Sequence, residues 1–135
     1  MTGKRAFVDT SGFLALLDAD DEFHLPAKTY WEELLRSSAE IITTDYVRLE
    51  SWALIQRRLG AKAAICFHDS LLPVCRIETV GEQGFDRAVA FWRVAHRKNL
   101  SIVDLTSFDC MRHAGIHTAL CFDRHFSEQG FEIPS

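Results

Sequence analysis

Four acidic side chains occupy positions from which they could bind one divalent cation. They are Asp9, Glu50, Asp104 and Asp123. Carboxylates gathered within a few ångströms repel one another unless protons or a cation compensate their charge. Carboxylate and water oxygens suit Mg²⁺ or Mn²⁺. Such an ion can activate water and stabilise a phosphate, so the four acids suit phosphoryl chemistry.

Asp9 marks the first junction at which a strand meets a helix. The apolar pair at 7–8 precedes it, and two good helix-capping residues, Thr10 and Ser11, follow it. A strand over 5–8 and a helix over 11–18 are therefore predicted. Open α/β sheets keep their ligand crevice at the carboxyl ends of the strands, which is where this places Asp9.

Asp104 and Asp123 follow apolar runs of the same kind, at 100–103 and 118–122. Both runs are predicted to be strands that end in an acid. Because the carboxyl ends of parallel strands lie at one edge of a sheet, the three aspartates are expected to meet there.

Glu50 belongs to a predicted helix over 45–59 that ends at Gly60. It follows Val47 by three residues and precedes Leu54 by four, so it is expected on their inward face. A carboxylate facing a core is costly without a cation or hydrogen bonds, which favours a metal ligand. A place at the rim of the helix, paired with a neighbouring arginine, remains the alternative.

Hydroxyl side chains adjoin two of the acids and would orient ligands or contact phosphate. They are Thr10 and Ser11 after Asp9, and Thr106 and Ser107 after Asp104. Capping of the helices that start there explains these hydroxyls equally well, and the two roles are compatible.

Strands and helices alternate along the chain. Strands are predicted at 5–8, 41–42, 74–80, 100–103 and 118–122, with a possible edge strand at 131–133; helices are predicted at 11–18, 24–37, 45–59, 61–72 and 81–98, and from 106 to Gly115. This alternation is typical of a parallel sheet with crossover helices. With 135 residues, no repeat and no linker, a single domain over 1–135 is expected.

Composition excludes several classes. Apolar residues at 47% and charged residues at 25% are ordinary globular values. No run approaches the about 18 apolar residues of a membrane span, and no signal region opens the chain, so a cytoplasmic protein is expected. A net charge of −4 argues weakly against nucleic acid. Basic clusters at 57–62 and 93–98 offset this, although such clusters are more often solvated helix faces.

The four cysteines contain no CxxC pair and are expected to stay reduced. The segment 110–121 reads C-x2-H-x3-H-x3-C, which is more compressed than the usual zinc patterns. A zinc site is therefore disfavoured there.

Four acidic motifs follow one another along almost the whole chain: F-V-D-T-S-G-F-L-A-L-L-D (7–18), T-T-D-Y-V-R-L-E-S (43–51), L-S-I-V-D-L-T-S-F (100–108) and F-D-R-H-F (122–126). Any one of them is a weak signal, but four in order are specific. Together they resemble the PIN-domain family, and in particular VapC-type toxin ribonucleases and their close single-domain relatives. The resemblance implies a three-layer α/β/α fold, a parallel sheet of about five strands, and acids at the carboxyl edge.

The resemblance also implies hydrolysis of single-stranded or loop RNA that depends on Mg²⁺ or Mn²⁺. Asp9 and Asp104 would be the principal metal ligands, and Glu50 and Asp123 would complete the pocket. The toxin branch implies a homodimer and a small antitoxin that covers the site. His125, in the fourth motif, would contact phosphate or simply pack.

Asp109 departs from the pattern, because such sequences often carry a small apolar residue at this place. It would either add a fifth acid or face solvent in the first turn of its helix, where negative charge is favoured; the second interpretation is preferred.

Other functions fit the residues less well. Phosphatases with an aspartate nucleophile need D-x-D after the first strand, and position 11 is serine. A signalling receiver needs a lysine at the end of a late strand, and none is suitably placed. A solitary RNA-processing nuclease, or a catalytically silent module that binds metal and RNA, remains compatible with the sequence.

Overall fold

The chain folds around a parallel sheet with the strand order β3-β2-β1-β4. Residues 3–95 and 99–134 are described here from a computed structural model. The strands are β1 (Arg5–Val8), β2 (Glu40–Thr44), β3 (Cys75–Glu78) and β4 (Ala119–Leu120). The α-helices are α1 (Thr10–Leu17), α2 (His24–Arg36), α3 (Asp45–Leu59), α4 (Ala61–Cys66), α5 (Gly81–Ala95), α6 (Ile102–Ala114) and α7 (Arg124–Glu128).

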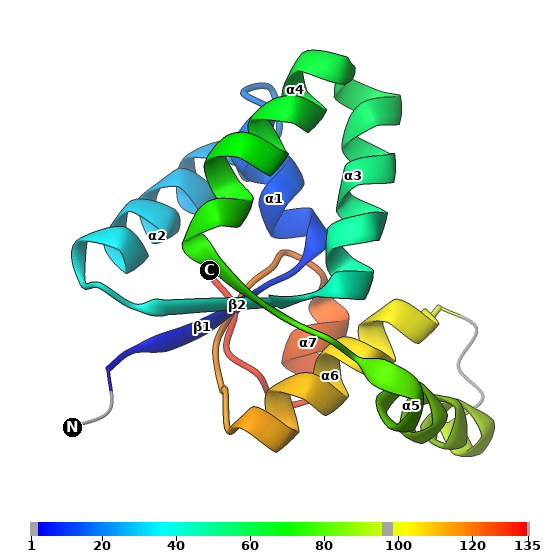
Figure 1. The fold of residues 1–135 in the computed structure, drawn as a ribbon. Helices are drawn as coiled ribbons and strands as arrows, with labels where there is room; N and C mark the ends of the chain where they lie inside the picture. The colour runs from blue at the N-terminus through cyan, green and yellow to red at the C-terminus, as the bar shows by residue number, and fades with distance from the viewer. Residues whose placement is uncertain (1–2, 96–98, 135) are drawn as a thin grey trace.

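The sheet is buried on both of its faces. In the central strand β1, Phe7 pairs with Ile42 of β2 on one side and with Ala119 of β4 on the other. All three side chains are at most 1% exposed, and so are Ala6 and Val8, which point to the opposite face of the sheet from Phe7. Helices must therefore cover both faces, as in other parallel sheets. In Figure 1, α1 to α4 lie on one side of the sheet and α5 to α7 on the other, which confirms the predicted three-layer α/β/α architecture.

The strand order places a topological switch point beside β1. The chain moves from β1 to β2 and β3 in one direction, then crosses back to β4 on the opposite side of β1. The connections on the two sides of such a point run over opposite faces of the sheet and leave a crevice at the carboxyl ends of the strands. Asp9 follows β1 and Asp123 lies beyond β4, so both acids border this crevice.

Most predicted elements are confirmed with small shifts of their ends. The helix predicted over 45–59 is α3 itself: the hydroxyl of Thr44 caps it by accepting from the Val47 amide at 3.0 Å, and Gly60 ends it at a φ of 93°. The predicted edge segment at 131–133 pairs with the β4 side through one parallel bridge, between Thr118 and Glu132.

The strand predicted at 100–103 is wrong, because α6 already begins at Ile102. The Ser101 hydroxyl accepts a hydrogen bond from the Asp104 amide at 3.0 Å and caps this helix. Asp104 therefore lies in the first turn of a helix and not at the end of a strand. Thr106 and Ser107, predicted as caps, lie inside α6.

Two further predictions about helices need correction or fall outside the described residues. The helix predicted over 61–72 is α-helical only as far as Cys66; it continues as a π-helical turn (Phe67–Leu71) and a 3-10 turn (Leu72–Val74). Residues 96–98 are not described. They include the end of the helix predicted over 81–98 and most of the basic cluster at 93–98.

Within residues 3–95 and 99–134, no helix combines the length and apolar character that a bilayer crossing requires.

Gly12 in α1 keeps this helix close to β4. A Cβ added there would lie 2.3 Å from the Leu120 carbonyl oxygen, which is part of the backbone and cannot move aside alone. We expect Gly12→Ala to lower the free energy of unfolding by about 1–3 kcal/mol, as overpacking does, although alanine elsewhere stabilises a helix. Urea denaturation measures this change.

The matched control is Gly3→Ala, because a Cβ there meets nothing within 4 Å. Equal stability of the two variants would contradict the close approach of α1 to β4.

Candidate metal centre

Asp9 is the most deeply buried of the four acids, at 4% exposure. Its backbone amide donates to the Leu120 carbonyl at 3.2 Å, and its own carbonyl accepts from the amides of Gly12 and Phe13. One carboxylate oxygen, Oδ2, lies 3.9 Å from the Cys121 thiol. The other, Oδ1, is buried and has no hydrogen-bond partner among the residues that the structure describes. The backbone is thus well anchored while the side chain is left with an unused oxygen.

Burial raises the pKa of Asp9 from 3.8 to about 7. The negative charge of Asp104 is the next largest cause, and Glu50 and Asp123 add smaller contributions in the same direction. A hydrogen bond from the Thr10 backbone opposes them. Three acids from distant parts of the sequence are therefore close enough to oppose the ionisation of Asp9.

Asp104 lies in the first turn of α6 and is 8% exposed. A helix N-terminus favours a negative charge, and the capping bond from its amide to Ser101 holds it in place. Burial nevertheless raises the pKa of Asp104 to about 6, with further contributions from Asp123 and Glu50. Burial and repulsion thus outweigh the favourable helix terminus.

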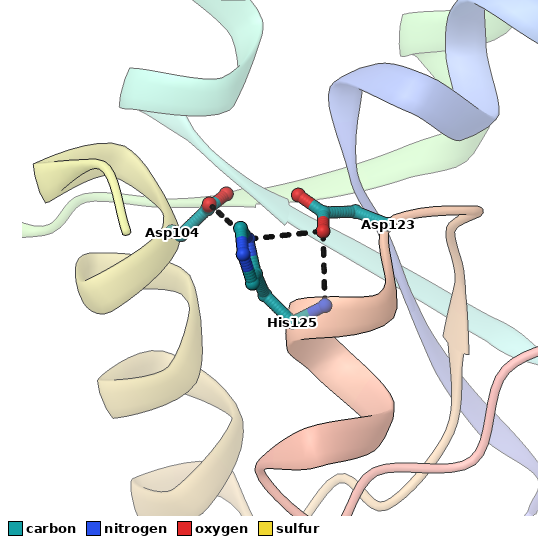
Figure 2. A group of neighbouring side chains, drawn as sticks. All are labelled: Asp104, Asp123 and His125. Carbon is teal, nitrogen blue, oxygen red and sulfur yellow. Dashed lines mark hydrogen bonds and ion pairs between the residues drawn. The ribbon is translucent and has the colours of Figure 1, made fainter. Parts of the chain in front are cut away.

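Asp123 caps the short helix α7 and brings His125 towards Asp104. Its Oδ1 accepts from the His125 amide at 2.9 Å. The ring Nδ1 of His125 lies 3.0 Å from that same oxygen and 3.7 Å from Oδ2 of Asp104. Figure 2 shows the ring between the two carboxylates. One ligand atom from each of the three side chains lies within 4.8 Å of the others.

Glu50 contradicts the prediction that it faces inward, because its residue is exposed. The buried positions of α3 are Val47, Ser51 and Ile55, which are spaced by four residues. Glu50 precedes Ser51 and so lies on the flank of this stripe, at the rim of the crevice. There its Oε1 accepts from the Thr10 hydroxyl at 3.1 Å, a contact with the acidic site and not the predicted arginine pair.

The hydroxyl residues take different places. Thr10 contacts Glu50 and also Ser51, whose hydroxyl is 2.9 Å away. The Ser11 hydroxyl accepts from the Phe122 amide at 2.9 Å and ties α1 to the segment before Asp123. These two residues therefore position the ends of the acidic motifs.

The two hydroxyl residues in α6 differ from each other. The Thr106 hydroxyl donates to the Val103 carbonyl at 2.7 Å, within its own helix. Ser107 is fully buried, and its Oγ has no hydrogen-bond partner within residues 3–95 and 99–134. Because Ser107 lies three residues after Asp104, it shares that acid's face of the helix. Of Thr106 and Ser107, only Ser107 shares the face of α6 that carries Asp104.

Asp109 is not a fifth acid, nor does it lie in the first turn of α6. It pairs with Arg87 of α5 through two bonds, of 2.9 Å from Nε and 3.0 Å from a terminal nitrogen. This bidentate pair joins the two helices.

The compressed cysteine and histidine segment forms no metal site in the described part of the chain. The one group of three or more ligating side chains found there is Asp104, Asp123 and His125. All four cysteines are free.

Sequence reasoning missed three residues that support the site: Ser51, Ser101 and Cys121. A signal existed for Ser101, since a serine three residues before an acid is a capping pattern that marks the start of a helix. The burial of Ser51 and the contact of Cys121 with Asp9 arise between distant elements, and no local pattern marks them.

The chemistry of these donors fits a hard divalent cation. Asp9 and Asp104 are buried carboxyls whose pKa values are raised, and Oδ1 of Asp9 is a buried acceptor without a donor. A cation bound among them would relieve the repulsion and satisfy this oxygen. Fold and site thus define a small α/β protein with an acidic crevice suited to oxygen-ligated metal.

Comparison with known proteins gives the family. The PIN domain family matches residues 6–132. The 23S rRNA-specific endonuclease VapC20 of Mycobacterium tuberculosis is 39% identical over 127 residues, which are 93% of this chain and 94% of that protein. The chain belongs to the PIN-domain family, as its motifs predict.

Solved structures agree with this assignment. The crystal structure of Mycobacterium tuberculosis VapC20, a sarcin-ricin loop cleaving toxin, has a TM-score of 0.80 at 38% identity and covers 93% of this chain and 95% of that one. FitAcB from Neisseria gonorrhoeae and VapBC2 from Rickettsia felis each have a TM-score of 0.70, at 12% and 10% identity, with 96% of both chains covered. The last two likenesses show the fold alone.

The raised pKa values of Asp9 and Asp104 predict how stability depends on pH without metal. Between pH 4 and 7 the native state holds protons that the unfolded state has lost, so stability falls as pH rises. The free energy of unfolding should decrease by up to about 1.4 kcal/mol per pH unit for each carboxyl that titrates. Urea denaturation in EDTA from pH 4.5 to 7.5 measures this.

Asp9→Asn should flatten this dependence, whereas Asp86→Asn, at an exposed position of α5, should leave it unchanged. Manganese added at pH 7.5 should restore stability to the wild type. A pH profile identical in wild type and Asp9→Asn would contradict the raised pKa.

Proposed function

We propose that this chain is a metal-dependent endoribonuclease, a single PIN-like domain over 1–135 that acts as the toxin of a toxin–antitoxin pair. The observation that carries this proposal is that Asp104 and Asp123 offer ligand atoms within 4.8 Å of each other, while both acids and Glu50 oppose the ionisation of the buried Asp9. The identity of 39% to an endonuclease of the VapC type, over nearly the full length of both chains, supports it. Hydrolysis of RNA is also the activity that the resemblance of the four acidic motifs implies.

Each acid would have a defined part in the reaction. Asp9, Asp104 and Asp123 would hold Mg²⁺ or Mn²⁺, with Glu50 completing the pocket from the solvent side. The ion, when bound, would lower the pKa of a water molecule and stabilise charge on the scissile phosphate. The protein keeps the carboxylates in position: Ser101 holds the turn that carries Asp104, and the His125 amide holds the Asp123 side chain.

The burial of Asp9 and the exposure of Glu50 agree with these different roles. Asp9 is 4% exposed, and the low polarity of its buried surroundings would strengthen its attraction to a cation. Glu50 is held by Thr10 at the rim, where water and a phosphate would enter. The hydroxyls of Thr10, Ser11 and Ser107 would orient ligands around this centre, as polar neighbours of metal ligands do. Thr106, bonded within its own helix, would not.

The similarity to VapC20 also indicates the substrate and partners. The related protein is a 23S rRNA-specific endonuclease and a sarcin-ricin loop cleaving toxin. We place the cleavage site of this chain in a structured loop of large-subunit ribosomal RNA, with a small antitoxin that covers the acidic crevice. A homodimer, a cytoplasmic location and no membrane association belong to the same proposal.

Removing one metal-binding carboxylate tests the proposed chemistry. Asp9→Asn and Asp104→Asn should each reduce metal-dependent RNA cleavage at least about a hundredfold, because a few kcal/mol of transition-state stabilisation is lost. The folded structure should survive, since the repulsion is relieved and little volume changes. Cleavage is followed on labelled RNA with Mn²⁺ and with EDTA, and folding by circular dichroism.

The control is Asp69→Asn, at an exposed carboxylate that pairs with His68. It should cleave RNA as the wild type does. Cleavage that persists in Asp9→Asn, or that is insensitive to EDTA, would refute the assignment.

The proposed substrate is tested on ribosomes. With Mn²⁺ present, the wild type should cut 23S rRNA at one main position in the sarcin-ricin loop, mapped by primer extension, and Asp104→Asn should cut nowhere. Cleavage scattered over many loops would show that the chain shares the family but not this target.

A further inference from the structure

His125 is placed where a metal ligand would stand. It lies on α7 two residues after Asp123, and its amide is fixed by the bond to Oδ1 of that acid. Its ring is 17% exposed and lies between Asp104 and Asp123, as Figure 2 shows. The backbone anchor thus holds an imidazole against two carboxylates from different elements.

The ring nitrogen has an unusual environment. Nδ1 lies at ion-pair distance from both carboxylates, 3.0 Å from Asp123 and 3.7 Å from Asp104, but it makes a hydrogen bond to neither. Buried polar atoms without a hydrogen bond are rare in proteins, and a bound ion is one of the reasons for them. Nδ1 of His125 thus lies near two carboxylates without a hydrogen bond to either. This is the position expected of an atom that binds the same cation as they do.

The distances agree with one coordination shell. Neighbouring ligands of an octahedral ion with bonds of about 2.1 Å stand about 3 Å apart, and opposite ligands about 4.2 Å apart. The separations of Nδ1 from Asp123 and Asp104 fall in this interval, and all three ligand atoms lie within 4.8 Å of one another. The three side chains could therefore ligate one ion.

A second feature of the crevice indicates a ligand independently of His125. Oδ1 of Asp9 is buried and has no hydrogen-bond partner in the described part of the chain, and the charges of Asp104 and Asp123 act on this carboxyl. Asp9 and His125 thus each have one buried unpartnered atom, a carboxylate oxygen and an imidazole nitrogen. Both atoms can donate a lone pair to a cation.

We propose that His125 supplies, through Nδ1, a nitrogen ligand to the cation held by Asp104 and Asp123, and that the site therefore prefers Mn²⁺ to Mg²⁺. Magnesium takes oxygen ligands almost exclusively, whereas imidazole binds later divalent ions of the first transition row more tightly. This inference rests on the proposed metal site and specifies its donor set.

Pulsed EPR of the Mn²⁺-loaded protein, without RNA, tests the ligand directly. The wild type should show electron spin-echo modulation from a directly bound ¹⁴N nucleus, and His125→Gln should lose it. The control is His113→Gln, because His113 is an exposed histidine of α6 whose ring contacts Asp109. It should keep the modulation. Absence of nitrogen modulation in the wild type, which needs no variant to fold, would overturn the proposal.

Calorimetric titration of the same proteins with each metal tests the preference. Loss of the ligand should weaken Mn²⁺ binding by His125→Gln at least about tenfold, while Mg²⁺ binding changes by less than about threefold. Unchanged Mn²⁺ affinity would overturn the proposal and leave His125 as a phosphate contact. Tighter Mn²⁺ binding would overturn it as well, because His125 would then be a charged competitor of the metal.

The two proposals can fail separately. A protein that cleaves RNA with Mn²⁺ but shows only oxygen ligands retains the nuclease function and loses the nitrogen ligand. A protein with nitrogen modulation but no cleavage of RNA retains the ligand and loses the nuclease function.

Discussion

The structure depends on a carboxylate buried at the carboxyl end of the central strand. Asp9 costs free energy there, because burial and three neighbouring acids oppose its ionisation and one of its oxygens has no donor. A surface position would avoid this cost. The parallel sheet places Asp9 at the switch point next to β4, and the nearby backbone bonds keep it there. In the proposed function, a bound cation would relieve this cost.

The remaining acids are held by local devices that differ from one another. A serine cap sets the turn of α6 that carries Asp104, a helix cap sets Asp123, and the Thr10 hydroxyl holds Glu50 at the rim. Each device uses a backbone amide or a hydroxyl and leaves a carboxylate oxygen available. The site is therefore preorganised although its members come from distant parts of the sequence, which is what metal-assisted hydrolysis requires.

Packing at a distance from the site maintains the same geometry. The close approach of Gly12 to the Leu120 carbonyl brings α1 against β4, and Ser11 bonds to the Phe122 amide beyond that strand. Together they fix the two sides of the crevice to each other. On the other face of the sheet, the bidentate pair between Arg87 and Asp109 joins α5 to the helix that carries Asp104.

The family and the alternation of strands and helices were predictable from sequence patterns alone, and the same patterns predicted which acids form the site. These follow from local patterns: apolar runs that end in Asp9 and Asp123, the cap at Thr44, and the stop at Gly60. Prediction from the sequence was wrong where a local pattern fitted two kinds of secondary structure. The run 100–103 was apolar enough for a strand, but the Ser101 cap makes it the start of a helix.

The differences among the acids arise from contacts between elements that are distant in the sequence. Helical spacing predicted that Glu50 would face the core. The packing of α3 instead buries the next residue, Ser51, and leaves Glu50 exposed. The position of the His125 ring between two carboxylates, and the use of Asp109 to bind Arg87, depend on how separate elements meet. Sequence patterns fix what lies along one element, whereas contacts between elements depend on their relative positions, which no short pattern encodes.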